Sequence, residues 1–175
     1  MYFELFPTVD YVNFGQTNSK TVTNITKRPA VRQAIKDNLT VFTKHIIRSG
    51  ETPESIAFDF YGDAELHWII LLTNDIYDRY HQWPMNVNQF QTYVNEKYSD
   101  PFATHHFEIS QTSGDTTIKI DIGQDDTDHS GATAITNREF EESRQDTLRK
   151  IRLLDPTYVD QFVEEFENLI GASVL

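Results

Sequence analysis

The alternation of apolar and polar positions is clearest in the stretch from Val41 to Trp83. Around His45–Ile47 the two kinds of residue alternate, which predicts a half-buried strand. Downstream, Thr52 is a suitable N-cap, and Pro53 suits the first helical position, where its missing N–H costs nothing. A short helix is therefore predicted up to Gly62, which ends it. Its apolar face repeats at helical spacing and consists of Ile56, Ala57, Phe60 and Tyr61.

A second helix is predicted directly after the first. Asp63 can cap it, and its centre, Trp68–Leu72, is apolar on nearly every side, as in a helix that its neighbours bury. Asn74-Asp75 ends it. We interpret Trp68 as a packed residue rather than a sugar-stacking one, and the role of Trp83, which is nearer a loop, stays open. The predicted core residues are Ile56, Phe60, Trp68, Ile69 and Leu72.

The N-terminal arm comprises residues 1–38, and its residues 1–14 show no sustained helical or strand period. Its first 14 residues are rich in Phe and Tyr. A free aromatic segment of this kind is prone to aggregate, so we expect it to lie against this chain or a partner. Residues 15–29 are polar, rich in Thr and Asn, and are interpreted as a linker. A short helix is predicted over residues 30–38.

After Trp83-Pro84 the pattern predicts a helix and then a hairpin. Residues 87–98 have near-helical apolar spacing and stop before Asp100-Pro101. Residues 106–122 alternate on both sides of Thr112–Asp115, which predicts a β-hairpin that needs support from its surroundings. An acidic loop of small residues follows.

The C-terminal region is predicted to be mainly helical. Residues 137–149 are charged and fit a helix, and residues 150–154 continue it or form a strand. A last helix begins after Asp155-Pro156 and ends at Gly171, and it carries an apolar stripe opposite an acidic face. The stripe, which serves either the chain's own core or an interface, consists of Val159, Phe162, Val163, Phe166, Leu169 and Ile170.

Composition changes this picture through its aromatic residues. Only 38% of the 175 residues are hydrophobic, yet there are 12 Phe, 8 Tyr and 2 Trp. Aromatic side chains bury large areas and are enriched at interface hot spots, so a large aromatic core and contacts with other chains are both open. The candidate protein-interface residues are Tyr2, Phe3, Phe6, Tyr11, Tyr77, Tyr80, Trp83, Phe162 and Phe166.

Charge and cysteine content exclude several classes of function. The net charge of −12 argues against nucleic-acid binding and against an anionic membrane surface. The chain has no cysteine, so disulfides, zinc–thiolate sites and thiol nucleophiles are excluded. No signal peptide or membrane span is visible, and we expect synthesis in a cytosol-like compartment.

The sequence offers little catalytic chemistry. Phosphate-binding loops, nucleophile elbows and paired metalloprotease histidines are missing. His105 and His106 are neighbours on a predicted strand, so we expect them to point to opposite faces and not to share an ion. Residues 126–131 resemble the first half of an EF-hand loop, but the twelfth position is Asn137 rather than Glu, and a solvated loop is the simpler interpretation. Neither an enzyme nor a cofactor or metal site is expected.

Two family resemblances are carried by specific residues. The stretch Ser49-Gly50-Glu51-Thr52 with Ser55-Ile56-Ala57, after the predicted strand, resembles the LysM domain, a small βααβ module that binds N-acetylglucosamine polymers. The segments Tyr61-Gly62-Asp63, Leu66-His67-Trp68 and Asn74–Asp78, with Trp83, resemble a narrower family. That family is the small baseplate wedge subunit of contractile-tailed bacteriophages (wedge protein fifty-three family), which carries a LysM-like domain inside a longer chain. Residues 1–7 and 137–154 are also similar to it, whereas 100–135 lie outside the resemblance.

The resemblance implies an α+β fold with a LysM-like βααβ core, N- and C-terminal extensions and an inserted β-hairpin. The expected divisions are an N-terminal arm (1–38), the core (39–100), a hairpin and acidic loop insertion (101–135), and a C-terminal helical region (136–175). The implied function is structural: a virion component of the tail baseplate that joins neighbouring wedge proteins around the hub. Implied partners are other wedge proteins, with sheath-initiating or hub proteins as further candidates, in a hetero-oligomer with several copies per six-fold baseplate. The alternative is a LysM-type module that binds peptidoglycan, and a weaker one is a cell-wall hydrolase.

Overall fold

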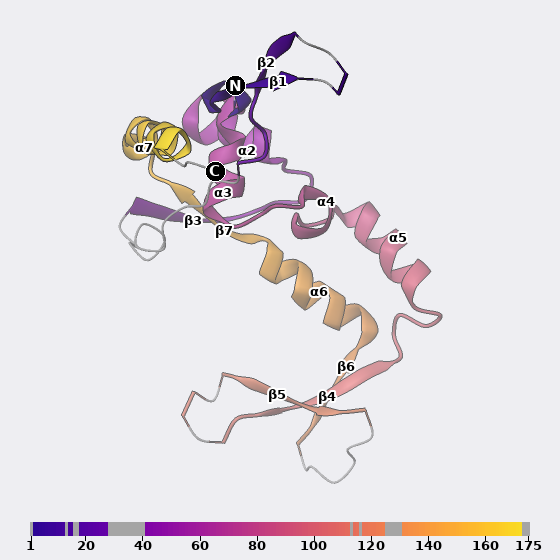
Figure 1. Ribbon diagram of the computed structural model, residues 1–175. Coiled ribbons are helices and arrows are strands. Elements are labelled where there is room, and N and C mark those ends of the chain that lie inside the picture. The colour runs from indigo at the N-terminus through magenta and orange to yellow at the C-terminus, as the bar shows by residue number, and fades with distance from the viewer. Residues whose placement is uncertain are drawn as a thin grey trace. The chain divides into compact units, whose positions relative to one another are not determined.

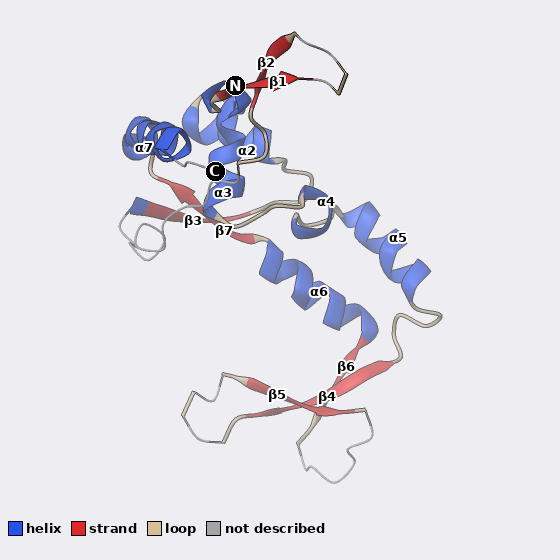
Figure 2. Cartoon of the chain, in the orientation of Figure 1, coloured by secondary structure: helices blue, strands red, loops and turns tan. Residues whose placement is uncertain are grey.

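The chain is an α+β protein, and its described residues combine helices with three small sheets (Figures 1 and 2). The computed structural model describes residues 2–12, 14–15, 18–27, 41–112, 114–115, 117–124 and 131–172. The chain forms two compact units, and each is considered by itself. The first unit contains Met1–Ile47, Glu51–Gln82 and Ile151–Leu175, and the second contains Arg48–Gly50 and Trp83–Lys150.

The N-terminal arm contains regular structure that the sequence pattern did not predict. A 3-10 turn, η1 (Tyr2–Leu5), precedes strand β1 (Thr8–Val12), which pairs antiparallel with β2 (Ser19–Thr23). The expectation of an irregular arm and a linker was therefore wrong for these residues. The threonines of β2 favour a strand, and the pairing of Val9 with Val22 places apolar side chains opposite each other. The helix predicted over 30–38 lies outside the described residues.

The two helices predicted from local signals are present. Helix α2 (Pro53–Tyr61) begins with a capping box in which Thr52 and Ser55 each accept a hydrogen bond from the other's backbone N–H. It ends at Gly62, whose φ of 79° is the left-handed conformation that glycine adopts without strain. Asp63 caps the next element through the N–H of Glu65, but the first turn is 3-10, η3 (Ala64–Leu66), before α3 (His67–Thr73).

A strand pair links distant parts of the first unit. Strand β3 (Phe42–Ile46) pairs with β7 (Lys150–Leu154), so the stretch 150–154 is a strand rather than a continued helix. Asn74, at the end of α3, adds a side-chain link to β7. Its Nδ2 donates to the carbonyl of Arg152 at 2.8 Å, and its Oδ1 accepts the Arg152 N–H at 2.9 Å. The amide of Asn74 thus binds β7 much as a neighbouring strand would. A short helix, α4 (Arg79–Gln82), follows α3.

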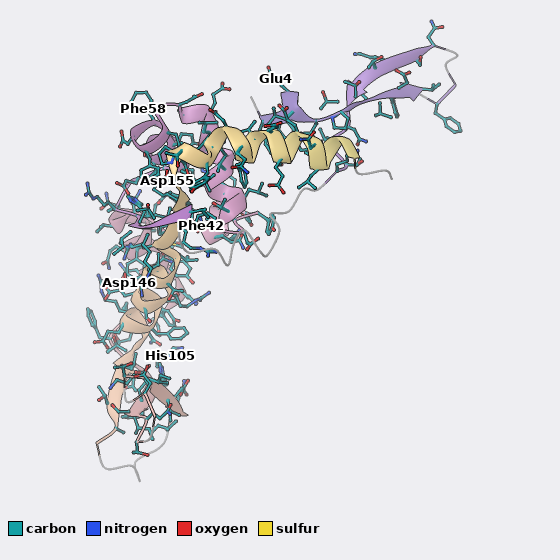
Figure 3. All side chains as sticks on the ribbon, turned by 90° about the vertical axis from the view of Figure 1, so that its left-hand side faces the viewer. Glu4, Phe42, Phe58, His105, Asp146 and Asp155 are labelled. Atoms are coloured by element: carbon teal, nitrogen blue, oxygen red, sulfur yellow. The ribbon has the colours of Figure 1, made fainter. Side chains whose placement is uncertain are left out.

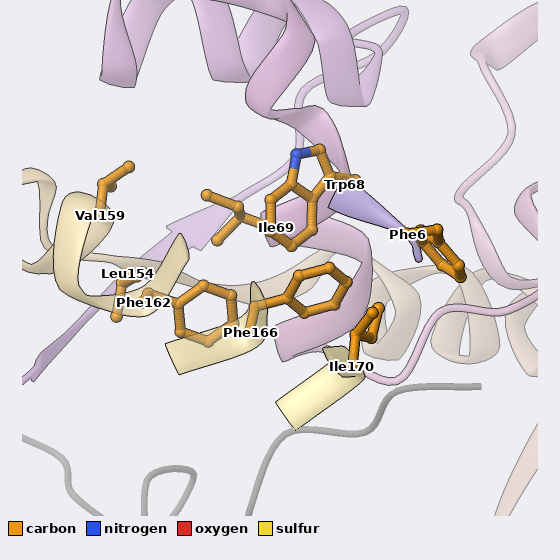
Figure 4. Packing of buried hydrophobic residues seen from close by; sticks show 8 residues of the cluster. All are labelled: Phe6, Trp68, Ile69, Leu154, Val159, Phe162, Phe166 and Ile170. Atoms are coloured by element: carbon orange, nitrogen blue, oxygen red, sulfur yellow. The ribbon is translucent and has the colours of Figure 1, made fainter. Parts of the chain in front are cut away.

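The hydrophobic core of the first unit lies between α3, the N-terminal turn and the last helix (Figure 4). After the 3-10 turn η4 (Pro156–Tyr158), helix α7 (Val159–Ala172) supplies its apolar stripe to this core. Of the predicted core residues, Ile56, Trp68 and Ile69 are buried, whereas Phe60 and Leu72 are half-buried. The residues of the cluster are Phe6, Trp68, Ile69, Leu154, Val159, Phe162, Phe166 and Ile170.

The second unit joins two helices to a three-stranded sheet. Its helices are α5 (Val87–Lys97) and α6 (Asn137–Leu148), each with a capping box. The predicted antiparallel pair is present as β4 (Thr104–Ser110) and β5 (Lys119–Gly123). A third strand, β6 (Thr133–Thr136), pairs with the other edge of β4 and was not predicted. The sheet order is β5-β4-β6.

The boundaries of the two units differ from the four predicted divisions. Helix α5 was placed in the core segment 39–100 but belongs to the second unit, and β7 was placed in the C-terminal region but pairs with β3. The difference arises because the strand that pairs with β3 comes more than 100 residues later in the chain. The division into 1–38, 39–100, 101–135 and 136–175 remains a prediction.

Candidate protein-binding surface

Some of the predicted interface residues lie inside the chain's own core. The ring of Tyr2 lies 5.0 Å from that of Phe6, 5.3 Å from Trp68 and 5.7 Å from Phe166, measured between centroids. Phe6, Phe162 and Phe166 are buried. These three residues are therefore unavailable to a partner as long as the first unit keeps this packing.

Other predicted interface residues are exposed. Phe3 is 53% exposed, Tyr77 71% and Tyr80 91%, and Tyr11 is also exposed on β1. Large aromatic side chains in water are unfavourable unless a partner covers them. Trp83, which belongs to the second unit, is half-buried.

A groove of about 1140 Å³ opens on the first unit next to the aromatic core. Phe6 and Trp68 contribute to its lining, which is mostly apolar. Two of the exposed aromatic residues, Phe3 and Tyr77, lie in the groove, whereas Tyr11 and Tyr80 do not. The more open apolar residues of its lining are Phe3, Ile25, Leu71, Leu72, Ile76 and Tyr77.

Polar side chains in the lining are held by neighbours. Glu54 accepts two hydrogen bonds from the guanidinium of Arg79, at 2.5 and 3.0 Å. Burial alone raises the pKa of the Glu54 carboxyl, but hydrogen bonds from its backbone and Thr52 and the charge of Arg79 outweigh this and lower it. The Lys27 ammonium donates to the carbonyl of Ile170 at 2.8 Å.

The second unit contains a buried ion pair that sequence reasoning missed. The Glu141 side chain is only 2% exposed. It accepts hydrogen bonds from Lys97 at 2.6 Å and from the Tyr98 hydroxyl at 2.9 Å, and Arg144 lies 3.4 Å away. This cluster ties α5 to α6. The spacing of 44 residues between Lys97 and Glu141 leaves no local sequence signal for it.

The two neighbouring histidines lie closer together than expected. A register shift in the β4–β6 pairing between Thr104 and His106 interrupts the regular alternation of side chains. The Nδ1 atoms of His105 and His106 are 2.9 Å apart, and His105 stacks on Phe140 with ring centroids 3.9 Å apart. The prediction that they point to opposite faces was therefore wrong.

Other chemistry is limited within the described part of the chain. No group of three or more His, Asp or Glu side chains there is arranged to hold a metal ion. The loop that resembles half an EF-hand lies, apart from Gly131, outside the described residues. Of the helices described, none has both the length and the apolar character to cross a membrane.

Comparison with known proteins identifies the family. Residues 1–106, more than half of the chain, match the family model described as "Base plate wedge protein 53". A stretch of 39 residues is 38% identical to "Baseplate wedge protein gp53" of Enterobacteria phage T4. That stretch covers 22% of this chain and 20% of the T4 protein, so the match spans about a fifth of the relative's length. The family match covers η1, the β1–β2 hairpin, the α2–α3 pair and the groove, and the chain belongs to the baseplate wedge protein 53 family.

Proposed function

We propose that this protein is a structural component of the baseplate wedge in a contractile phage tail. The observation that carries the proposal is the family match over residues 1–106. Its role is to join neighbouring wedge proteins around the hub, with several copies in a six-fold baseplate. Sheath-initiating and hub proteins are further candidate partners. The protein is made in the host cytoplasm and then incorporated into the virion.

The mechanism is burial of apolar side chains at contacts with other chains. Phe3, Tyr77 and Tyr80 supply exposed aromatic surface within the stretch that matches the family. Aromatic residues of this kind dominate binding energy when a partner desolvates them. Tyr11, on the exposed β1–β2 hairpin, gives a further contact of the same type.

We also propose a LysM-like core for the first unit. Strand β3, helix α2 and the η3–α3 segment follow each other in the order strand, helix, helix, and β7 supplies the second strand by pairing with β3. In this arrangement the βααβ module is interrupted by residues 83–149 rather than followed by them. The hairpin β4–β5 is part of that interruption.

The test is a phage in which the gene for this protein is deleted and supplied again on a plasmid. We expect the deletion to stop baseplate assembly, and the supplied protein to appear in purified tails at a multiple of six copies. Infectious particles with complete baseplates that lack the protein would contradict the proposal. If the protein had a catalytic role instead, the deletion would give particles with complete baseplates that fail to infect.

The alternative is a glycan-binding module, and one observation favours it. Phe3 and Tyr77 are exposed beside an open groove, where aromatic faces can stack on sugar rings. Against it, the carboxylates of the groove give no attraction to a neutral glycan. We expect no heat of binding for chito-oligosaccharides or peptidoglycan fragments at millimolar concentration in titration calorimetry. Saturable micromolar binding, lost in Tyr77→Ala, would favour the alternative over the structural role.

A further inference from the structure

The groove of the first unit has an apolar lining and an acidic rim. Glu54 and Glu65 lie in the lining itself. Two further exposed carboxylates contact lining residues: Asp63 accepts the Glu65 N–H at 2.8 Å, and Asp75 accepts the Tyr77 hydroxyl at 3.0 Å. Exposed Glu4 (Figure 3) and Asp78 are sequence neighbours of the lining residues Phe3 and Tyr77.

The described cations in or beside the lining, apart from histidines, are fewer than these acids. They are Lys27, which donates to the Ile170 carbonyl, and Arg79, which is paired with Glu54. Among the described residues, acids therefore outnumber cations in and beside this apolar lining.

We infer that this groove binds an amphipathic segment of another baseplate chain, whose apolar anchors are flanked by lysine or arginine. This inference rests on the proposed function and adds the chemistry of the partner. A helix that lays its apolar face into a groove uses anchors at i, i+3 or i+4 and i+7, and a volume of about 1140 Å³ accommodates several such side chains. Basic residues beside the anchors meet the carboxylates of the rim.

Charge argues for this occupant over a second copy of the same chain. A second copy carries the same net charge of −12, and like charges facing each other across an interface suppress association. The described elements that carry exposed apolar residues, such as Val9 and Tyr11 on β1, also offer few cations to the rim. A basic amphipathic segment satisfies both features of the groove.

The first experiment is site-specific photo-crosslinking in assembled particles. A benzophenone amino acid replaces Tyr77 in the groove or, as a matched control, Phe58, which is 62% exposed on α2 and does not line the groove (Figure 3). We expect position 77, but not position 58, to crosslink to one segment with helically spaced apolar residues flanked by Lys or Arg. A crosslink from position 77 to an acidic segment, a second copy or a glycan overturns the inference.

The outcomes separate this inference from the proposed function. If the protein is present in purified baseplates and position 77 gives no crosslink, the groove has no protein occupant and the inference alone fails. If the protein is absent from the particles, the proposed function fails and the inference fails with it.

The second experiment measures affinity. The crosslinked segment is synthesised as a peptide and titrated into the full-length protein. We expect Tyr77→Ser and Glu65→Lys each to weaken binding at least about tenfold, and added salt to weaken it further. Matched controls are Phe58→Ser and Asp59→Lys, which change the same kinds of exposed residue outside the groove and should stay within about twofold. Equal losses in the Asp59 and Glu65 variants would show a non-specific charge effect and overturn the inference.

Discussion

Removing either partner of the Lys97–Glu141 pair should destabilise the second unit by different amounts. The Glu141 side chain is 2% exposed and that of Lys97 is 38% exposed. Glu141→Gln keeps the shape and still accepts hydrogen bonds, and it leaves a lysine that can turn toward water. Lys97→Met instead leaves a buried carboxylate with the Tyr98 hydroxyl and the partly exposed Arg144.

The magnitudes follow from this asymmetry. Hydrogen bonds to a charged group contribute about 1.5–3 kcal/mol and neutral ones about 1 kcal/mol, so Glu141→Gln should cost about 1–2 kcal/mol. Breaking a buried ion pair so that one charge stays buried without its partner costs about 3–5 kcal/mol. In Lys97→Met the remaining donors to the Glu141 carboxylate reduce this cost to about 2–4 kcal/mol. Screening by solvent at Lys97 is part of the reason for the lower figure.

The two variants should also differ in their response to pH. Burial alone raises the pKa of the Glu141 carboxyl, but hydrogen bonds from Lys97 and Tyr98 and the lysine charge outweigh it, so the pKa is lowered. A lowered pKa stabilises the fold above the unfolded value, about 4.3, and this stability is lost as the pH falls through the folded value. In Lys97→Met the buried carboxylate is protonated more easily, so its deficit relative to the natural protein should shrink near pH 4.

The assay is urea denaturation followed by far-ultraviolet circular dichroism at pH 7 and pH 4. Free energies of unfolding from the two variants and the double variant form a cycle that isolates the pair. The reasoning is refuted if Glu141→Gln costs as much as Lys97→Met, or if the deficit of Lys97→Met is the same at both pH values.

Three further predictions concern stability in denaturant melts. Trp68→Ala should lower the free energy of unfolding by about 3–5 kcal/mol because the indole is packed in the core. The control Phe58→Ala, on the surface, should change it by less than about 0.5 kcal/mol. A loss under about 1 kcal/mol for Trp68→Ala would contradict the packing. Asn74→Ala should cost about 1–3 kcal/mol because it removes both side-chain hydrogen bonds to β7, and an unchanged midpoint would show that those bonds contribute nothing. Gly62→Ala should destabilise the fold by about 1 kcal/mol because the φ of Gly62 is 79°, a left-handed conformation that strains alanine. Gly171→Ala should stabilise it by up to about 1 kcal/mol because Gly171 lies inside α7 and no atom lies near the added Cβ. Changes of the same sign in the two variants would refute this contrast.

The sequence predicted elements whose signals are local. Helix α2 was predicted from its first residue to its last because Thr52, Pro53 and Gly62 act on neighbouring backbone groups. Helices α5 and α6 followed from apolar spacing and charge in the same way. The β1–β2 hairpin and strand β6 were missed because their stability comes from cross-strand pairing, which leaves a weak pattern in short polar strands.

Aromatic content indicated the kind of surface but not its members. Phe3 and Phe6 are three residues apart in one 3-10 turn and its continuation, yet the first is exposed and the second buried. Which side faces the core depends on Trp68 and Phe166, which are far away in the sequence. The groove likewise depends on contacts between residues far apart in the sequence, because its lining comes from η1, the segment after β2, and the α2–α3 region.

The pairing of β3 with β7 has a consequence for synthesis on the ribosome. The first unit takes residues from three separate stretches, and its core is incomplete until Phe162 and Phe166 have been made. At about 5–20 residues per second, roughly 5–20 s separate the translation of Trp68 from that of Phe166. Before α7 emerges, both stretches of the second unit, Arg48–Gly50 and Trp83–Lys150, have been made and can fold, while the aromatic residues of the arm and α3 lack their final neighbours. We therefore expect the nascent chain to recruit holdase chaperones, with the demand ending only when α7 emerges from the ribosome.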